Sequence, residues 1–369
     1  MRKLLQFGLL TLTCVSANSA YALQAKKITS DLDAPWGLTY INSETMLVTQ
    51  KGGEVKHINL ATGTRHTLFK APDVWVNGQG GLLDITLSPK DNHTLYFTYS
   101  KSVDGDGVTT LATAQYQNQK ITDWQDVFIS KSRTDTSRHF GSRITFDAGH
   151  LYFSIGDRGE RENGQNTLTH AGSILRLNLD GSVPQDNPYV TNSSALNEIW
   201  SYGHRNPQGL FFDFDSQQLW SIEHGPRGGD EINRIIKGAN YGWPVTSHGK
   251  EYWGPIRVGE AEEKDGIESP VKVYIPSIAP SSLVLYRGEK FPELNGKLLA
   301  GALKLTHINV ITIDVTKNQT DKNEKHPYQA AAEDRLFEEL NERIRDIETT
   351  PDGNIFFITD SGNLYQITR

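Results

Sequence analysis

The sequence contains a single cysteine, Cys14, among its 369 residues. It lies within the first 22 residues, which we expect to be removed, so the mature chain has no thiol. This absence excludes a disulfide framework, a zinc–thiolate centre and an iron–sulfur cluster. Long apolar runs are missing too. The longest, residues 4–15, is shorter than the ~18–20 residues of a membrane-spanning helix, so we expect no membrane insertion.

The N-terminus has the features of a secretory leader. Arg2 and Lys3 precede the apolar run, and Ala20-Tyr21-Ala22 has the small-x-small pattern of a cleavage site. A buried first strand or helix is the alternative, but it does not explain why these three features occur in this order. We therefore interpret residues 1–22 as a signal peptide and expect the mature protein to be periplasmic or secreted.

Positive charge is in deficit. The chain has 37 Lys and Arg against 44 Asp and Glu, a net charge of −7, and the leader takes two of the basic residues. An acidic chain is poorly suited to coating nucleic acid, so we expect no such partner. Hydrophobic residues make up 37% of the chain, enough for a sizeable core, and its 33 glycines indicate many turns.

Helical patterns are also scarce. We predict one helix, at residues 330–340, and a shorter turn at residues 163–170. The rest reads as short strands in six similar units, each with an apolar strand followed a few residues later by a second strand. The first strands of these units begin near Trp36, Leu82, Ser142, Gly209, Ser282 and Ile344.

Six similar units in series, without a linker, predict an all-β fold: a six-bladed β-propeller of four-stranded antiparallel blades over residues 23–369. Turn signals such as Pro351-Asp-Gly-Asn fit the connections between strands. Two packed β-sandwiches are the alternative, but they would not produce six like units. Propellers gather loops from all blades at one axial mouth, so polar residues in those loops are the candidates for a site.

Common catalytic motifs are absent. There is no P-loop, no H-E-x-x-H, no G-x-S-x-G and no dinucleotide fingerprint. Residues 77–81 are glycine-rich but lead into a strand, which does not suit a phosphate cradle. Asp104-Gly-Asp-Gly begins like an EF-hand loop but lacks the Glu at its twelfth position, so we interpret it as a turn.

Charged and imidazole side chains occur in turn-rich context at four unit boundaries, residues 138–143, 203–209, 223–233 and 341–346. Taken singly, each fits a structural role, because ion pairs at loop tips often join neighbouring blades. Together, Arg205, Lys304, Arg343 and Arg345 come from three blades of an acidic protein. We expect them to form a positive mouth that binds a polyanion carrying carboxylates or phosphates.

An oxygen-rich segment lies beside these cations. Gly225 and Pro226 offer backbone carbonyls, and Asp230 and Glu231 offer carboxylates. This donor set suits Ca²⁺ rather than zinc. A tight turn without a metal is the alternative.

Several of these segments also resemble a known family, the soluble pyrroloquinoline-quinone (PQQ)-dependent sugar dehydrogenases, and the likeness is closer to the aldose sugar dehydrogenase branch. It extends in order over essentially the whole mature chain. The matching segments include Arg138-His-Phe-Gly-Ser-Arg, Gly156-Asp-Arg-Gly, residues 173–188, Gly203-His-Arg-Asn-Pro-Gln-Gly, His224-Gly-Pro, Asn240-Tyr-Gly-Trp-Pro and Arg343-Ile-Arg-Asp.

The resemblance implies a six-bladed propeller that holds PQQ, a tricarboxylate quinone, and Ca²⁺ at its mouth. On this basis the expected cofactor-binding residues are Gln79, Arg205, Asn206, Ser277, Lys304, Arg343 and Arg345. The expected metal-binding residues are Gly225 and Pro226 through their carbonyls, Asp230 through water, and Glu231 and Tyr241 at a second, structural calcium site.

The resemblance also implies a mechanism. His139 matches the family's general base, which takes the proton of the anomeric hydroxyl while a hydride moves from C1 to the quinone. Asp157 would orient the imidazole, and Arg205 with Ca²⁺ would stabilise developing negative charge. The sequence departs from the family at two positions. Arg138 stands where some relatives have an acidic residue, and Ser277 stands where the glucose-specific branch has threonine. Both departures leave the preferred sugar open.

We therefore expect a periplasmic quinoprotein, monomeric or weakly dimeric, that oxidises aldoses to lactones and passes electrons to an external acceptor. Two alternatives stay open. One is a calcium-dependent propeller lactonase, which would not need four converging cations. The other is a non-catalytic carbohydrate-binding propeller, in which Trp36, Trp75, Trp243 and Trp253 would stack on sugars, although core packing is the alternative role for most of them.

Overall fold

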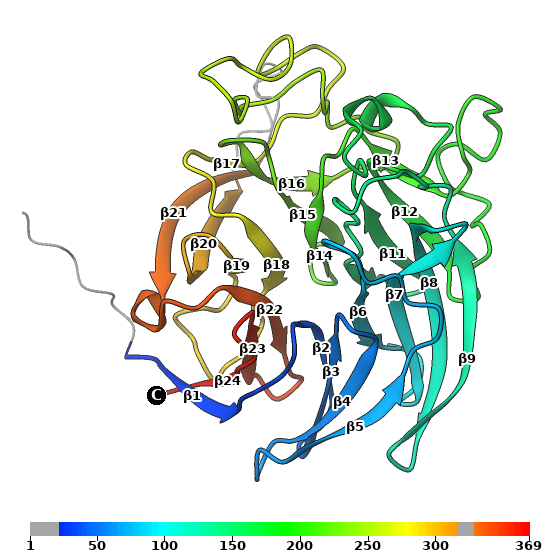
Figure 1. Cartoon of the computed structure of the whole chain (residues 1–369). Helices are drawn as coiled ribbons and strands as arrows, with labels where there is room; N and C mark the ends of the chain where they lie inside the picture. The colour runs from blue at the N-terminus through cyan, green and yellow to red at the C-terminus, as the bar shows by residue number, and fades with distance from the viewer. Residues whose placement is uncertain (1–21, 316–327) are drawn as a thin grey trace, which may run out of the picture.

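The computed structural model describes residues 22–315 and 328–369. Within these residues the chain forms six four-stranded sheets, all antiparallel, that stand around a common centre as the blades of a ring (Figure 1). The predicted six-bladed β-propeller is therefore confirmed. The expected signal peptide falls almost entirely outside the described residues.

Five blades are each formed by four consecutive strands. The first two contain β2 (Pro35–Asn42), β3 (Thr45–Gln50), β4 (Glu54–Asn59), β5 (Arg65–Lys70), β6 (Leu82–Leu87), β7 (Thr94–Val103), β8 (Asp106–Gln117) and β9 (Lys120–Ile129). The next two contain β10 (Ile144–Phe146), β11 (His150–Ile155), β12 (Ser173–Asn178), β13 (Ile199–Tyr202), β14 (Pro207–Asp213), β15 (Gln218–Glu223), β16 (Asp230–Ile235) and β17 (Lys272–Tyr274). The fifth contains β18 (Pro280–Leu285), β19 (Leu298–Ala302), β20 (His307–Val315) and β21 (Tyr328–Leu336).

The sixth blade joins the two ends of the chain. It contains β22 (Ile344–Thr349), β23 (Ile355–Thr359), β24 (Leu364–Thr368) and β1 (Gln24–Thr29). Strand β1 pairs antiparallel with β24, with Gln24 opposite Thr368, and Figure 1 shows the blue and red strands side by side. Backbone hydrogen bonds between the first and last strands therefore close the ring.

In each blade, one edge strand lies nearest the centre of the ring, and it is the first of the blade's consecutive strands. Strands β2, β6, β10, β14, β18 and β22 contact one another in sequence around the centre, and β22 returns to β2. These are the strands at which the six sequence units were predicted to begin. Because their N-terminal ends follow loops from one face of the ring, those loops meet at the axis.

The apolar core lies between neighbouring blades. Leu47 and Val55 of the first blade, for example, pack with Leu82 and Phe97 of the second, and all four side chains are fully buried. Each buried side chain of this size contributes about 1.5–3 kcal/mol through removal from water. The rigid wall formed in this way positions the loops of the mouth.

The prediction of a helix at residues 330–340 is wrong. This segment forms β21, which pairs with β20 at the outer edge of its blade, and only a 3₁₀ turn, η2 (Glu338–Leu340), follows it. Its Ala, Glu and Arg content favours a helix, but pairing with β20 outweighs that weak preference. The predicted turn at residues 163–170 overlaps a short 3₁₀ helix, η1 (Arg161–Gln165).

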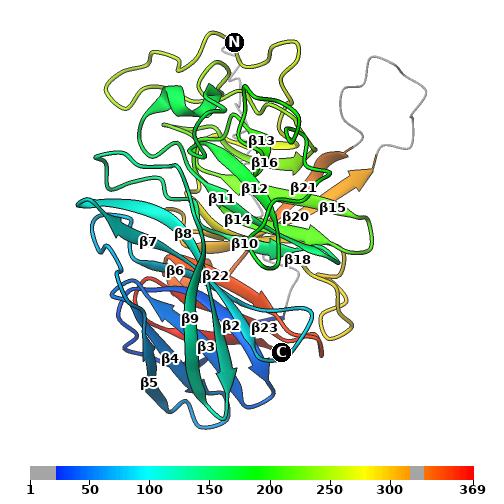
Figure 2. The same ribbon diagram turned by 90° about the vertical axis from the view of Figure 1, so that its right-hand side faces the viewer.

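The connection between β16 and β17, residues 236–271, is long and projects from one end of the ring, at the top of Figure 2. Arg227 ties this loop to the preceding turn, because its backbone exchanges hydrogen bonds with Lys250. No helix in the described part of the chain has the length and apolar character needed to cross a bilayer.

Candidate active site

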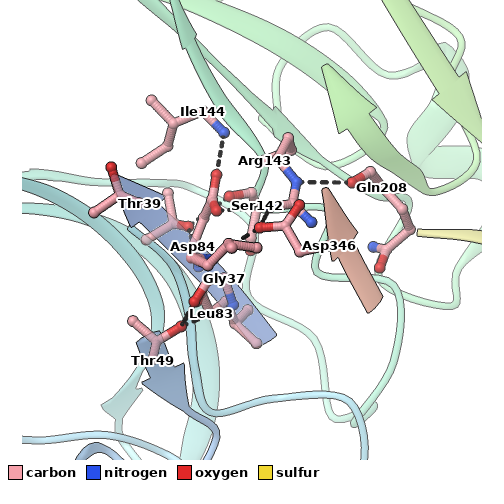
Figure 3. Close-up of polar contacts among 12 residues, drawn as sticks. Gly37, Thr39, Thr49, Leu83, Asp84, Ser142, Arg143, Ile144, Gln208 and Asp346 are labelled. Carbon is pink, nitrogen blue, oxygen red and sulfur yellow. Dashed lines mark hydrogen bonds and ion pairs between the residues drawn. The ribbon is translucent and has the colours of Figure 1, made fainter. Parts of the chain in front are cut away.

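A buried arginine at the centre of the ring joins five blades (Figure 3). Arg143 Nη1 lies 2.7 Å from Asp84 Oδ1 and 2.9 Å from Asp346 Oδ2. Its Nε and Nη2 donate to the carbonyls of Gln208 and Ser281. One guanidinium therefore fixes the relative positions of the inner strands that support the mouth.

The carboxylates around this guanidinium are buried, and burial raises their pKa values. The pKa of Asp346 rises to about 7 although Arg143 opposes the rise. The pKa of nearby Glu348 rises to about 8, through burial and then repulsion from Asp346. This part of the axis therefore binds protons more readily than ordinary carboxylates do.

The mouth contains a cavity of about 210 Å³ next to this cluster. Trp36 lines the cavity, and the guanidinium carbon of Arg143 lies 4.5 Å from the Trp36 ring centroid. Four predicted cofactor-binding residues, from three different blades, line the same space: Gln79, Asn206, Arg343 and Arg345. The structure thus brings two of the four predicted cations, Arg343 and Arg345, into this cavity, whereas Arg205 and Lys304 do not line it.

Arg343 and Arg345 share one carboxylate. Asp360 accepts hydrogen bonds of 2.7 Å from Nε of each arginine. Burial alone would raise the pKa of Asp360, but the two guanidinium groups lower it overall. The two arginines thus carry one more positive charge than Asp360 balances, and their positions are fixed before any ligand arrives.

His139 and Asp157 are joined by a short hydrogen bond at the mouth. His139 Nδ1 lies 2.6 Å from Asp157 Oδ1. The other carboxylate oxygen accepts a 2.8 Å hydrogen bond from Trp243 Nε1. With Nδ1 donating to Asp157, Nε2 of a neutral imidazole is left with its lone pair available. His139, Asp157 and Arg205 line one cavity of about 310 Å³, so the three predicted catalytic residues lie together.

The electrostatic surroundings favour a neutral histidine. Burial lowers the pKa of His139 from 6.5, Arg205 lowers it further, and the hydrogen bond to Asp157 only partly opposes this. Burial would raise the pKa of Asp157, but the contact with His139 and the charge of Arg205 lower it overall. Near neutral pH the pair therefore consists of a neutral imidazole and a carboxylate, as a general base requires.

The backbone around the pair is held in unusual conformations. His139 has φ of 57° and Arg158 has φ of 58°, in the left-handed region that costs a non-glycine residue energy. Arg158 has a fully buried side chain. Its guanidinium donates hydrogen bonds to four backbone carbonyls, those of Gly107, Ser132, Thr136 and Arg138. Arg158, the residue after Asp157, therefore holds the loop that leads to His139. It links the two members of the pair.

Gln79 connects the two cavities. Its side-chain oxygen accepts a 2.7 Å hydrogen bond from the His139 backbone amide. Its backbone amide donates to the Ser137 carbonyl. Asn206 has a similar role, because its side-chain oxygen accepts the amide of Gly141. Both predicted ligand-binding residues thus also support the histidine loop.

Arg205 lies between three loops of the mouth. Its backbone amide donates to Glu223, at 2.7 Å, and its guanidinium donates to the carbonyl of His224. Burial lowers the pKa of His224 to about 3, and the charge of Arg205 adds to this effect. His224 is therefore a neutral polar wall of the mouth rather than a further cation.

Four of the five predicted metal-binding residues line one small cavity. Its volume is about 20 Å³, enough for a single water-sized ligand, and its walls include Gly225, Pro226, Glu231 and Tyr241. The Tyr241 hydroxyl donates to the Arg234 carbonyl and accepts from the Ile236 amide, so it is already paired within its own blade.

Two carboxylates at this small cavity repel each other. Burial raises the pKa of Glu231 to about 8, and the charge of Glu223 adds to the rise. A bound cation would relieve this repulsion. Within the described ranges no three His, Cys, Asp or Glu side chains converge as a metal site, so any ion here depends on backbone carbonyls as well.

Asp230 has a different position. Its carboxylate is buried and accepts hydrogen bonds from the Gly225 amide, the Ser277 hydroxyl and the Ala279 amide. Ser277 also accepts from the Gly228 amide. In this structure Asp230 and Ser277 hold the Gly225–Pro226 turn, and their roles toward metal and cofactor stay predictions.

Lys304 lies apart from the other predicted cations. Its backbone amide donates to the Ile278 carbonyl, but its side chain is exposed and does not line the mouth cavity. Its role in cofactor binding also stays a prediction.

Sequence reasoning missed several residues of the site, namely Lys51, Asp360, Arg158 and the Asp157 contact of Trp243. Lys51 follows β3 and lies outside every matching segment, and Asp360 lies in the turn Asp360-Ser-Gly-Asn after β23, which resembles the other turns between strands. Two of the matching segments offered a signal, Gly156-Asp-Arg-Gly for Arg158 and Asn240-Tyr-Gly-Trp-Pro for Trp243.

Comparison with known proteins identifies the family. The model of the family described as glucose/sorbosone dehydrogenase matches residues 32–366. The chain belongs to this family. The glucose/sorbosone dehydrogenase match confirms the resemblance inferred from the sequence motifs.

Relatives within the family agree with the aldose branch. The aldose sugar dehydrogenase YliI of Escherichia coli is 36% identical over 375 residues, covering 98% of each chain. The quinoprotein glucose dehydrogenase B of Acinetobacter calcoaceticus is 29% identical over 423 residues, covering 92% of this chain and 86% of the relative. The apo-form crystal structure of the E. coli aldose sugar dehydrogenase superposes with a TM-score of 0.86, covering 94% of this chain and 99% of that one, at 35% identity. The relatives are thus oxidoreductases that act on sugars.

Proposed function

We propose that this protein is a PQQ- and calcium-dependent dehydrogenase that oxidises aldoses at C1 to lactones. The observation that carries the proposal is the position of the His139–Asp157 pair, at the wall of a cavity that adjoins a cation-rich one. The names of two relatives, an aldose sugar dehydrogenase and a quinoprotein glucose dehydrogenase, support it.

The mouth fits a flat, multiply charged acid. Trp36, Leu83 and Phe140 give the cavity apolar surfaces against which a ring system packs. Arg343 and Arg345 supply donors for carboxylates, with only Asp360 to balance them. When bound, a quinone of this kind supplies a two-electron acceptor for the hydride of the sugar.

The small cavity fits a calcium ion. Its carbonyl and carboxylate groups are the hard oxygen donors that Ca²⁺ prefers, and the Glu223–Glu231 repulsion favours a cation. The carbonyls of Gly225 and Pro226 and the Glu231 carboxylate, which the resemblance assigns to two separate calcium sites, line this one cavity and would hold a single ion, and Asp230 would fix the turn that presents the carbonyls. A bound Ca²⁺ would supply positive charge beside Arg205.

His139 is the proton acceptor in this proposal. Its Nε2 takes the proton of the anomeric hydroxyl as the C1 hydride leaves, so C1 becomes the lactone carbonyl. Asp157 holds the Nδ1 proton and stabilises the imidazolium that forms, and Trp243 keeps the carboxylate oriented. Arg205 lies beside the pair and places fixed positive charge where negative charge develops.

Other properties belong to the same proposal. Secretion to the periplasm fits the predicted leader. An external acceptor would take the electrons from the reduced quinone. We expect a monomer or a weak homodimer in solution.

Reconstitution tests the proposed function. Purified apoprotein is mixed with glucose and a redox dye, with PQQ and Ca²⁺ added separately or together. The proposal predicts dye reduction only when both are present. Lactone hydrolysis without dye reduction would support a lactonase, and saccharide binding without turnover would support a carbohydrate-binding propeller.

A further inference from the structure

Lys51 is a lysine of the mouth that no sequence motif indicated. It lies directly after β3 of the first blade, and its half-buried side chain lines the same cavity as Arg343, Arg345 and Gln79. Its backbone is fixed on both sides, because its amide donates to the Ala34 carbonyl and its carbonyl accepts from the Leu82 amide. The ammonium group is therefore presented to the cavity by a rigid turn.

The ammonium group of Lys51 has no carboxylate partner among the described residues. Its Nζ donates to the Gly78 carbonyl at 2.7 Å, whereas Arg343 and Arg345 share Asp360. Burial lowers the pKa of Lys51, the charge of Arg345 lowers it further, and the charge of Asp360 only partly opposes this. A cation in such surroundings gains from an anion brought by a ligand.

The position of Lys51 also relates it to the base. Gly78, which accepts its hydrogen bond, precedes Gln79, and the Gln79 side chain accepts the His139 amide at 2.7 Å. Two hydrogen bonds and the Gly78–Gln79 peptide therefore connect the Lys51 ammonium to the His139 loop. Arg343 and Arg345 reach the same cavity from the sixth blade. Together the three cations address different edges of one ligand.

We propose that Lys51 is a further anion-binding residue of the mouth, whose ammonium contacts a carboxylate of the bound ligand and orients it toward His139. The inference rests on the proposed function only for the identity of that ligand, PQQ. It assigns a role to the first blade, which supplies none of the predicted cations.

A purely structural clamp on Gly78 is the competing role, and charge distinguishes the two. Lys51→Met keeps the length of the side chain but removes the charge, and Lys51→Arg keeps the charge. Lys70→Met removes an exposed lysine from the same blade and serves as a matched control. The measurement is equilibrium binding of PQQ to apoprotein in Ca²⁺ buffer at several salt concentrations, together with the melting temperature of each apoprotein.

We expect Lys51→Met to weaken PQQ binding about 10–100-fold, the effect of losing a charge-assisted hydrogen bond, and to reduce the salt dependence of binding. Lys51→Arg should stay within a few-fold of the wild type, and Lys70→Met should be unchanged. Unaltered affinity in Lys51→Met would overturn the inference. So would weaker binding with an unaltered salt dependence and a lower melting temperature.

A second probe separates this inference from the proposed function. If wild-type apoprotein does not bind PQQ, the proposed function fails, and binding of benzene-1,3,5-tricarboxylate then tests Lys51 alone. Salt-sensitive binding that is lost in Lys51→Met would support the anion site. No binding of the tricarboxylate by the wild type would overturn it.

Discussion

The Nδ1 atom of His139 lies 2.6 Å from Oδ1 of Asp157, although the two residues belong to different loops of the mouth. This contact determines which ring nitrogen carries the proton and leaves Nε2 as the acceptor of a residue that lines the cavity. The catalytic part of the proposed function depends on it.

Substitution of Asp157 by Asn should therefore lower kcat about 10²–10⁴-fold while PQQ binding is retained. The amide cannot stabilise an imidazolium and no longer enforces the Nδ1–H tautomer. Steady-state kinetics of the reconstituted variant, with a separate measurement of bound quinone, checks this. Asp73→Asn, at an exposed surface aspartate, is the control. A variant with bound quinone and wild-type kcat would contradict the assignment.

The pH dependence of the reaction follows from the lowered pKa of His139. Because burial holds that pKa below 6.5, the base is deprotonated at neutral pH, and activity should fall only as the pH drops through the lowered value. In Asp157→Asn the carboxylate that raises this pKa is lost, so the acidic limb should move to still lower pH. A pH–kcat profile of both proteins measures the shift, and an acidic limb above pH 6.5 in the wild type would be inconsistent with a buried neutral base.

Arg158 should act as a positioning residue for the base. Replacement by Met removes three hydrogen bonds to the loop that carries His139 and one to Gly107 of β8, so we expect kcat to fall at least about 10-fold with a smaller change in KM. Added guanidinium should restore part of the lost kcat. Arg133→Met, at an exposed arginine nearby, is the control. If Arg158→Met lowers only the melting temperature and leaves kcat and its pH profile intact, the residue is merely structural.

Calcium removal should destabilise the folded protein as well as abolish activity. An ion held by native carbonyls and carboxylates binds only the folded state, so added Ca²⁺ should raise the melting temperature of chelator-treated protein. Glu231→Gln should reduce this rise, because it removes one carboxylate of the small cavity. Thermal unfolding over a range of Ca²⁺ concentrations gives the result. Equal calcium responses in the variant and the wild type would place the ion elsewhere.

Glu348 predicts an unusual dependence of stability on pH. Its folded-state pKa is raised to about 8, so between about pH 4.5 and 8 the native state binds a proton that the unfolded state releases. Its contribution to stability is present below the unfolded pKa and is lost as the pH rises through the folded value. Glu348→Gln should flatten the decline in unfolding free energy from pH 5 to pH 8.5, as measured by denaturant titration. A steeper decline in the variant would contradict the raised folded-state pKa of Glu348.

The sequence alone predicted the ring and much of its mouth. The six apolar first strands, such as those at Trp36 and Leu82, were visible because each is followed by a turn and a second strand. His139, Asp157 and Arg205 were found because they lie in segments that match a family. The structure then placed all three on one cavity.

Other features depend on pairing between distant segments. The strand β21 looked helical because its Ala-rich composition favours a helix, and only its register with β20 shows otherwise. Lys51 and Asp360 enter the mouth because blades far apart in sequence meet at the axis. Lys304 was grouped with the other cations because it follows an apolar strand and because of the family resemblance, whereas its side chain is exposed in this structure.

An anaerobic single-turnover experiment tests the central claim most directly. Protein loaded with PQQ and Ca²⁺ is mixed with one equivalent of glucose, and the absorption of the bound quinone is followed without any other acceptor. We predict stoichiometric reduction of the quinone with formation of one equivalent of lactone. His139→Gln, with the quinone bound, should react at least about 10²-fold more slowly. Reduction at the wild-type rate in His139→Gln, or no reduction in the wild type, would contradict the account.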